Sequence, residues 1–243
     1  MKELLDSLAK KYETKNFISS DPIQFPHKYK EKEDIEISAF ISSLFAFGKR
    51  EMFIKKLEFI FSQFNTPSEL IKDYKKFNLD EFVYRFIKSR DLLELLRILN
   101  KLYYIDKSSL EELCTSKNRL NKITEYFYQN SSCSDSTGFC FMFAKPENNS
   151  AMKRLNMFLR WMVRDGEVDF GIWKNIKKSE LLIPLDTHVS KISRKFNLLK
   201  RKQNDMKAVI ELTENLKNYD ENDPVKYDFA LFGLGVSNEA DKI

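Results

Sequence analysis

Apolar residues recur at helical spacing along most of the chain. One face of the first segment is lined by residues three or four positions apart, namely Leu4, Leu5, Leu8 and Tyr12. Residues 34–64 are apolar enough to predict a buried helix that ends near Gly48, followed by a second helix to about residue 64. Gly48 suits the position just after a helix C-terminus, where a left-handed backbone is favoured.

Helix start signals extend this pattern toward the middle of the chain. Thr66 and Pro67 are typical of an N-cap and the first residue of a helix, and Ser108 or Ser109 with a downstream glutamate resembles a capping box. The helical pattern continues in four stretches, namely LDEFVYRFI, SRDLLELLRILNKLYYI, SSLEELC and RLNKITEYFYQ.

The clearest break lies at residues 129–150, where small and polar residues and a glycine interrupt the helical rhythm. Helical patterns resume after this break, and the chain has no sequence repeat or low-complexity region. We predict an all-α fold of many helices. It would form a single domain over residues 1–243, with two lobes that divide near 129–150.

Composition agrees with a helical fold and limits the chemistry. The 6 glycines and 6 prolines are too few for the turns of a β-rich protein, and the net charge of +5 permits a phosphate-rich ligand without demanding one. Cys114, Cys133 and Cys140 form no CxxC pair, so we expect free thiols, no metal site and no cofactor. No apolar run approaches the ~20 residues of a membrane span. We therefore expect a cytoplasmic protein with no membrane partner.

Residues 150–164, SAMKRLNMFLRWMVR, predict a helix with two contrasting faces. The apolar face consists of Met152, Leu155, Leu159, Met162 and Val163. A second stripe, with no acid in the helix to neutralise it, consists of Lys153, Asn156, Arg160 and Arg164. The ordinary interpretation of such a stripe is a solvated basic face.

Lys153 also allows a chemical interpretation. With Ser150 as N-cap, Lys153 would lie in or just after the first turn of the helix. The partial positive charge of a helix N-terminus disfavours an ammonium group, and a lysine nucleophile needs a free lone pair. Lys153 is therefore a candidate nucleophile.

The stretch LLIPLDTHVSKISRKFNLL, residues 181–199, brings an acid to the start of another helix. Pro184 biases Ile183 toward an extended backbone, and Asp186 then occupies the N-cap position, a role worth about 1 kcal/mol. A capping carboxylate is rigid and ionised, so this role does not exclude chemistry. His188, two residues into the helix, is more often a hydrogen-bonded structural residue than a catalyst.

The segment LDTHVSKISRKFNLL resembles the VDTHVxRxxxRLGL segment of the helix-hairpin-helix DNA glycosylase superfamily. In bifunctional members an upstream lysine attacks the sugar C1′ to form a Schiff base, and the aspartate supports that step. The resemblance implies that Lys153 is this nucleophile, that Asp186 is this aspartate and that DNA is the partner. The interval between the two residues is similar to that of archaeal 8-oxoguanine DNA glycosylases. LFAFGKREMFIKKLEFIF also resembles the superfamily's early helix pair, whose polar turn faces DNA and would here present Lys49 and Arg50.

Over nearly its whole length the chain resembles a bacterial family of uncharacterised proteins, through DPIQFPHKY, KRLNMFLRWMVR, IPLDTHV and DPVKYDFALFGLG. It differs from the glycosylases in the hairpin, which usually reads like LPGVG, with glycines that let backbone N–H groups approach a phosphate. The corresponding AKPENNSAM has no glycine and would use Asn148 and Asn149 for left-handed turns. The carboxy-terminal cysteines that hold an iron–sulfur cluster in some members are also absent.

These observations favour a DNA base-excision glycosylase/lyase that acts on a damaged base. Phosphate contacts, or alternatively scaffold pairing, would involve Arg160, Arg164, Lys191 and Arg194, with Lys49 and Arg50 at the DNA-facing turn. Further pocket candidates are His27, Asn156 and His188. One alternative is a non-catalytic nucleic-acid-binding module on the same fold. Another is a helical interaction protein or small-molecule enzyme whose polar stripe pairs with internal acids such as Asp169 or Asp228.

Overall fold

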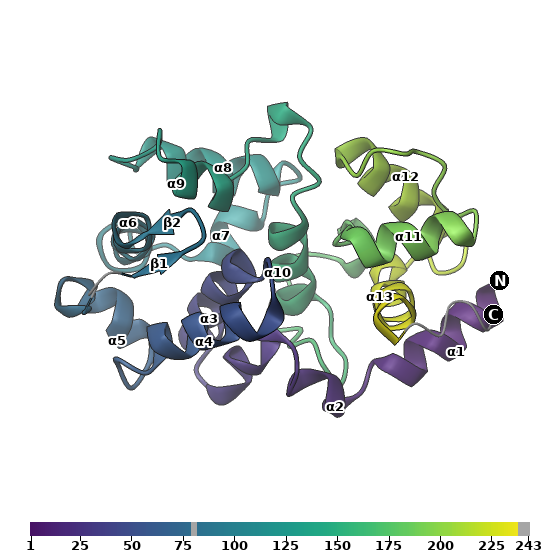
Figure 1. Ribbon diagram of the computed structural model, residues 1–243, viewed down its shortest axis with the longest axis horizontal. Helices are drawn as coiled ribbons and strands as arrows, with labels where there is room; N and C mark the ends of the chain where they lie inside the picture. The colour runs from purple at the N-terminus through teal and green to yellow at the C-terminus, as the bar shows by residue number, and fades with distance from the viewer. Residues whose placement is uncertain (79–81, 238–243) are drawn as a thin grey trace. The chain divides into compact units, whose positions relative to one another are not determined.

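The structure is a computed structural model that describes residues 1–78 and 82–237 (Figure 1). Most of these residues are helical, so the predicted all-α class is confirmed. The one sheet within the described ranges is a hairpin of two short antiparallel strands, β1 (Val83–Tyr84) and β2 (Ile87–Lys88). Among the same residues, no helix is long and apolar enough to cross a membrane.

The chain divides into two compact units. Unit 1 combines Met1–Asp21 with the chain from Pro146 onward, and unit 2 is Pro22–Lys145. The chain thus changes unit twice, after Asp21 and after Lys145.

Unit 2 is built around a helix that is buried along nearly its whole length. Its helical elements are η1 (Pro22–Gln24), η2 (Pro26–Lys28), α3 (Lys32–Phe45), α4 (Arg50–Phe61), α5 (Pro67–Lys72), η3 (Tyr74–Lys76), α6 (Ser89–Asn100), the π-helical η4 (Lys101–Ile105), α7 (Leu110–Cys114), α8 (Arg119–Gln129) and α9 (Thr137–Met142). Every residue of α3 from Asp34 onward is buried. Its Phe40 lies 5.3 Å from the ring of Phe127 in α8, which stacks on Phe143 at 4.2 Å. Aromatic packing therefore forms much of this core.

The predicted start signals in unit 2 are confirmed. The Thr66 hydroxyl accepts the backbone N–H of Glu69 at 3.1 Å and caps α5, and Ser109 caps α7 through the N–H of Glu112. The end of α3 differs from the prediction, because the helix stops at Phe45 and Gly48 lies in the following turn. Gly48 does adopt the expected left-handed backbone, with φ of +81°.

The stretch LDEFVYRFI is not helical where it is described, and its residues 79–81 lie outside the described residues. Residues 83–88 form the hairpin instead. Tyr84 and Ile87 make a buried cross-strand pair, whereas Val83 and Lys88 make an exposed pair. This period of two is typical of a half-buried strand, and Arg85 takes the left-handed turn position with φ of +56°.

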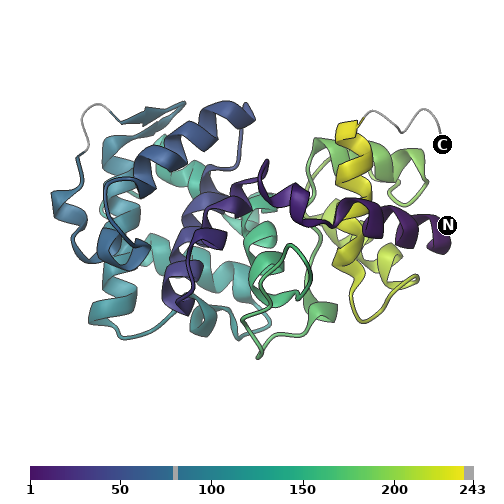
Figure 2. The ribbon, with the colours of Figure 1, turned by 90° about the horizontal axis from the view of Figure 1, so that it is seen from below.

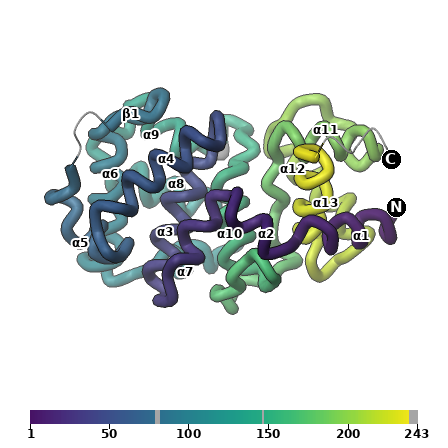
Figure 3. The backbone as a smooth tube through the Cα atoms, turned by 60° about the horizontal axis from the view of Figure 1, so that its bottom comes forward, coloured from purple at the N-terminus to yellow at the C-terminus, as the bar shows by residue number. Residues whose placement is uncertain are grey.

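Unit 1 places its last helix against its first. Its helical elements are α1 (Lys2–Tyr12), α2 (Lys15–Ile18), η5 (Pro146–Asn148), α10 (Lys153–Val163), η6 (Lys178–Glu180), α11 (Thr187–Lys195), α12 (Met206–Lys217), η7 (Pro224–Lys226) and α13 (Tyr227–Ser237). Helix α13 crosses α1 and packs against it, and it also packs on α11 (Figure 2 and Figure 3). Two glycines allow this approach, because a Cβ at Gly233 would collide with the Tyr12 ring and one at Gly235 would lie 2.9 Å from the His188 Cβ.

Candidate functional site

Helix α10 begins at Lys153, and its start is not capped as predicted. The N-cap residue is Met152, with a left-handed φ of +47°, and no side chain caps the helix. Ser150 lies outside the helix and accepts the backbone N–H of Met152 at 3.2 Å. Lys153 is therefore the first residue of α10, and its side chain is half-buried.

The polar stripe of α10 exists at the predicted spacing but is buried. Asn156, Arg160 and Arg164 are only 1%, 4% and 5% exposed. These three residues therefore do not form a solvated basic face. A buried guanidinium group requires charged partners, because removing an ion from water costs several kcal/mol.

Acidic residues from distant parts of the chain provide these partners. Arg160 lies 3.2 Å from Asp169 and contacts Asp228, while its guanidinium carbon lies 4.3 Å from the centroid of the Phe229 ring. The geometry thus favours the pairing with Asp169 and Asp228 that the sequence left open, over a contact with phosphate. The net pKa of Arg160 is raised, because these acids outweigh the burial that lowers it.

Arg164 extends the same network. It lies 3.1 Å from Asp169 and 2.8 Å from Asp223, and it also pairs with Glu13. Its paired guanidinium group ties the segment after α1 to the loop that follows α10 and to the start of η7. Like Arg160, Arg164 is therefore a scaffold residue in this structure.

The predicted capping role of Asp186 is confirmed. Its Oδ1 accepts the backbone N–H of Val189 at 2.8 Å, at the start of α11. The other carboxylate oxygen, Oδ2, lies 3.5 Å from Nδ1 of His188. The Asp186 side chain is 18% exposed and that of His188 is 48% exposed. Asp186 is therefore held by the helix N-terminus through Oδ1, while Oδ2 faces the partly exposed His188 of the same helix.

Asp228 of α13 connects Lys153 with Asp186 electrostatically. Burial raises the pKa of Asp228 to about 6, against the lowering influence of Arg160. The negative charge of Asp186 raises this pKa further, and the positive charge of Lys153 lowers it. Both side chains therefore lie within electrostatic range of one buried carboxyl group. Three helices, α10, α11 and α13, contribute this cluster.

Acids outnumber cations around this cluster. The cations are Lys153, Arg160, Arg164 and Lys178, and the acids are Glu13, Asp21, Asp169, Asp186, Asp223 and Asp228. Burial raises the pKa of Asp169 and of Asp223 above the usual value, although Arg164 opposes the change in both. A group with surplus acids can hold or accept a proton near neutral pH.

The other predicted residues lie outside this cluster. Arg194 donates hydrogen bonds to the carbonyl oxygens of Arg201 and Lys202, at 2.8 Å each, so it clamps the loop between α11 and α12. Lys191 is exposed on α11. Three predicted site residues belong to unit 2 and are exposed, namely His27 on η2 and Lys49 and Arg50 at the start of α4.

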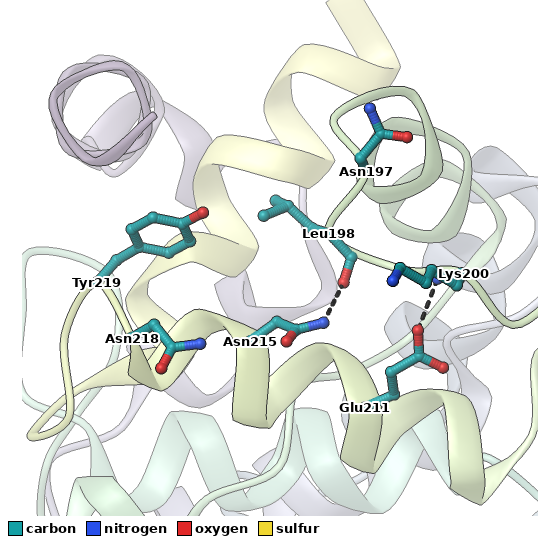
Figure 4. Close-up of a pocket in the computed structure, with 7 residues that line it drawn as sticks. All are labelled: Asn197, Leu198, Lys200, Glu211, Asn215, Asn218 and Tyr219. Atoms are coloured by element: carbon teal, nitrogen blue, oxygen red, sulfur yellow. Dashed lines mark hydrogen bonds between the residues drawn. The ribbon is translucent and has the colours of Figure 1, made fainter.

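A hollow of about 450 Å³ lies between the end of α11 and α12 (Figure 4). It is lined by Asn197, Leu198, Lys200, Glu211, Asn215, Asn218 and Tyr219. Asn215 donates to the Leu198 carbonyl at 2.8 Å, and Glu211 accepts the Lys200 backbone N–H at 2.6 Å. None of the predicted site residues lines this hollow.

Asp228 is the residue whose chemical role the sequence did not reveal. It was considered only as a partner for the cationic stripe, and its raised pKa depends on burial that only the fold creates. The available signal was an acid within the otherwise apolar helix sequence YDFALFGLG. Across the described ranges, no three His, Cys, Asp or Glu side chains are grouped so as to hold a metal ion.

A comparison with protein-family models assigns the chain to a family. Residues 21–237 match the family described as protein of unknown function DUF2400. The chain belongs to this family. The predicted membership of an uncharacterised family is thus confirmed, and the match includes Lys153, Asp186 and Asp228. Comparisons with curated proteins and with solved structures found no match.

Proposed function

We propose that unit 1 carries the site of a DNA base-excision glycosylase/lyase, with Lys153 as nucleophile and Asp186 as the supporting carboxylate. The proposal is supported by the placement of Lys153 at the start of α10 and of Asp186 at the start of α11, both within electrostatic range of the buried Asp228 of α13. A lysine, a rigid carboxylate and a carboxyl group with a pKa of about 6 together make up the groups that amine-based cleavage of a glycosidic bond requires.

The turn before α10 supports a hairpin of the superfamily's kind, built without glycine. Asn149 and Met152 both adopt left-handed conformations, with φ of +54° and +47°. The Asn149 carbonyl accepts the backbone N–H of Met206, and Ser150 forms an isolated antiparallel β-bridge with Asp205. Asn149 thus provides the left-handed backbone that the sequence led us to expect from an asparagine.

In the proposed reaction, Lys153 first loses a proton. The ammonium proton passes to solvent, because Asp228 is in contact with Arg160 and a carboxyl group with a pKa of about 6 is too weak a base to take it. This transfer leaves a lone pair on Nζ of Lys153.

The amine then displaces the base. A bond forms from Nζ to C1′ as the bond from C1′ to the base nitrogen breaks, and the base leaves with that electron pair and takes up a proton. Of the two protons then on Nζ, one goes to the departing base, and the other passes to the ring oxygen O4′ as the C1′–O4′ bond breaks and the C1′=Nζ double bond of the Schiff base forms. The Oδ2 oxygen of Asp186, which does not cap the helix, would stabilise the positive charge that develops on the sugar. Arg160 and Arg164 would act as positioning residues that hold the acids in place.

Borohydride trapping tests this function. Wild type, Lys153→Gln, Asp186→Asn and the control Lys207→Gln, which changes an exposed lysine of α12, would be incubated with duplexes. The duplexes carry an abasic site, 8-oxoguanine, uracil or an alkylated base. We expect a covalent adduct with wild type and Lys207→Gln, none with Lys153→Gln and slower trapping with Asp186→Asn.

Two outcomes would contradict parts of the proposal. Base release without an adduct would remove Lys153 as nucleophile and leave a hydrolytic glycosylase that uses water. Neither release nor an adduct on any of these duplexes would refute base excision of these lesions.

A further inference from the structure

Three phenylalanine rings meet in unit 2 where the hairpin, the α3–α4 turn and α9 come together. The Phe47 ring lies 4.5 Å from Phe141 and is stacked on Phe86 at 5.6 Å, with an interplanar angle of 14°. Phe86 and Phe141 lie 4.3 Å apart. The Tyr84 hydroxyl donates to the carbonyl oxygen of Phe47 and so fixes the turn to the hairpin.

These rings differ from the aromatic core around them. Phe47, Phe86 and Phe141 are each half-buried, whereas the rings of Phe45 and Phe139 are fully buried. A half-buried ring offers part of its face to a planar ligand. Nucleic-acid bases stack on such rings with little dependence on sequence, because every base has a π-face.

The surroundings of the rings are cationic. Segments 47–50, 83–90 and 137–142 contain no acid, and their cations are Lys49, Arg50, Arg85, Lys88 and Arg90. All five cations are exposed. The two nearest acids along the described chain are Glu51, in the first turn of α4, and Asp91. Asp91 is buried and accepts the hydroxyl of Ser136 and the backbone N–H of Lys88, and its Oδ1 also lies 4.0 Å from Nε of the exposed Arg90.

Arg85 is the closest of these cations to the rings. Its guanidinium carbon lies 6.0 Å from the centroid of Phe47. Gly48 leaves room for it, because a Cβ at this glycine would lie 2.7 Å from Nη1 of Arg85. The left-handed turn position of a two-residue hairpin usually holds glycine or asparagine. Here the position instead places a cation beside an aromatic ring.

We propose that these eight residues, which we call the ring surface, bind unpaired nucleotides of a nucleic-acid strand. The phosphates would contact the cations, and a base would stack on Phe86 or Phe141. Paired bases are less suitable ligands, because their faces are covered by neighbouring bases in the duplex. The ring surface lies entirely within unit 2 and does not depend on the chemistry of Lys153.

Fluorescence anisotropy with the full chain tests this binding. The probes are fluorescein-labelled 12-mers of oligo(dT) and oligo(rU), and a 12-base-pair DNA duplex serves as competitor. Phe86→Ala is expected to weaken binding of the single strands about tenfold, whereas Phe86→Trp keeps the stacking surface and should preserve it. The matched control is Phe59→Ala, which removes a ring that is 37% exposed on α4 of the same unit.

Salt dependence tests the cations separately. The slope of log affinity against log salt should fall by about 0.7 for each phosphate contact that Lys49→Gln or Arg85→Gln removes. Lys117→Gln, an exposed lysine of unit 2 outside the ring surface, should leave the slope unchanged. Equal binding of oligo(dT) and oligo(rU) would assign the surface to unpaired strands in general. If one is preferred, oligo(dU) separates the effect of the sugar from that of the C5 methyl group of thymine.

Three results would overturn the proposal: no binding of either single strand, wild-type affinity of Phe86→Ala, or equal competition by the duplex. Thermal unfolding of Phe86→Trp shows whether the hairpin tolerates substitution. Lys153→Gln must bind the single strands as wild type does, so failure of the trapping reaction and failure of the ring surface are distinguishable.

Discussion

The cationic stripe of α10 and the ring surface of unit 2 carry similar residues in opposite environments. Arg160 and Arg164 are 4% and 5% exposed and are ion-paired with acids from three other segments. Lys49, Arg50 and Arg85 are exposed, and their segments contain no acid. The same kind of charge therefore stabilises the fold in one unit and is available to a ligand in the other.

Solvation explains this difference. A buried guanidinium group is tolerated only with its partners, so removing either side leaves an uncompensated charge. An exposed cation keeps its water, and ion pairs at the surface contribute at most about 1 kcal/mol to stability. Substitutions of the buried arginines should consequently lower stability, whereas substitutions of the exposed cations should lower ligand binding and leave stability nearly unchanged.

The largest effect is expected for Arg160→Met. This variant leaves the buried Asp228 without the cation that contacts it, although Asp169 keeps Arg164, and the free energy of unfolding should fall by about 3–5 kcal/mol. Urea unfolding followed by circular dichroism would measure the change. Arg50→Met, at an exposed position of α4, should change the same quantity by less than about 0.5 kcal/mol.

A second measurement sharpens this test. Adding Asp228→Asn to Arg160→Met removes the stranded charge, so the double variant should recover part of the lost stability. Equal losses in Arg160→Met and Arg50→Met would show that the α10 network does not carry the stability we assign to it.

The contrast also explains what the sequence could predict. The spacing of Lys153, Asn156, Arg160 and Arg164 was readable, because helical periodicity is local. Their burial was not, because the acids that pair with the arginines come from residues 13, 169, 223 and 228. Likewise the capping role of Asp186 followed from its neighbours alone, whereas its influence on Asp228 required the packing of α13.

The hairpin was missed for a related reason. Its strands have two residues each, too short for a period of two to stand out among helical patterns. Arg85 adopts a left-handed backbone, which a sequence usually signals with a glycine. The rings of Phe47, Phe86 and Phe141 come from three segments, so no local pattern could group them.

An intermediate effect is expected for the pH dependence of Asp228. The folded-state pKa of about 6 exceeds the ordinary value of 3.8, so the folded protein binds this proton more tightly. The resulting stability is fully present below about pH 4 and is lost as the pH rises to about 6. Asp228→Asn removes this loss. Relative to wild type, the variant should therefore gain up to about 3 kcal/mol between pH 4 and pH 7.

Asp165→Asn provides the control of opposite sign. Hydrogen bonding from Lys178 lowers the pKa of the exposed Asp165. Wild type should therefore lose the contribution of this group as the pH falls through that lowered pKa, and the variant should not. Urea midpoints measured at half-unit steps of pH would give both differences. Identical pH profiles for wild type and Asp228→Asn would show that Asp228 does not hold its proton as proposed.

The smallest effect on stability, and one with reversed sign, is expected for Arg85→Gly. A left-handed backbone costs an L-residue roughly 1–2 kcal/mol, and glycine removes this cost. The greater freedom of glycine in the unfolded chain takes back about 0.5–1 kcal/mol of that stabilisation. The variant should therefore be unchanged or slightly more stable, by less than about 1 kcal/mol, as measured by thermal unfolding. It should also bind oligo(dT) more weakly, because the cation beside Phe47 is lost. A stabilised variant with weakened binding would mean that Arg85 is retained at the expense of the hairpin, whereas a clear loss of stability would make this arginine a structural residue like Arg160.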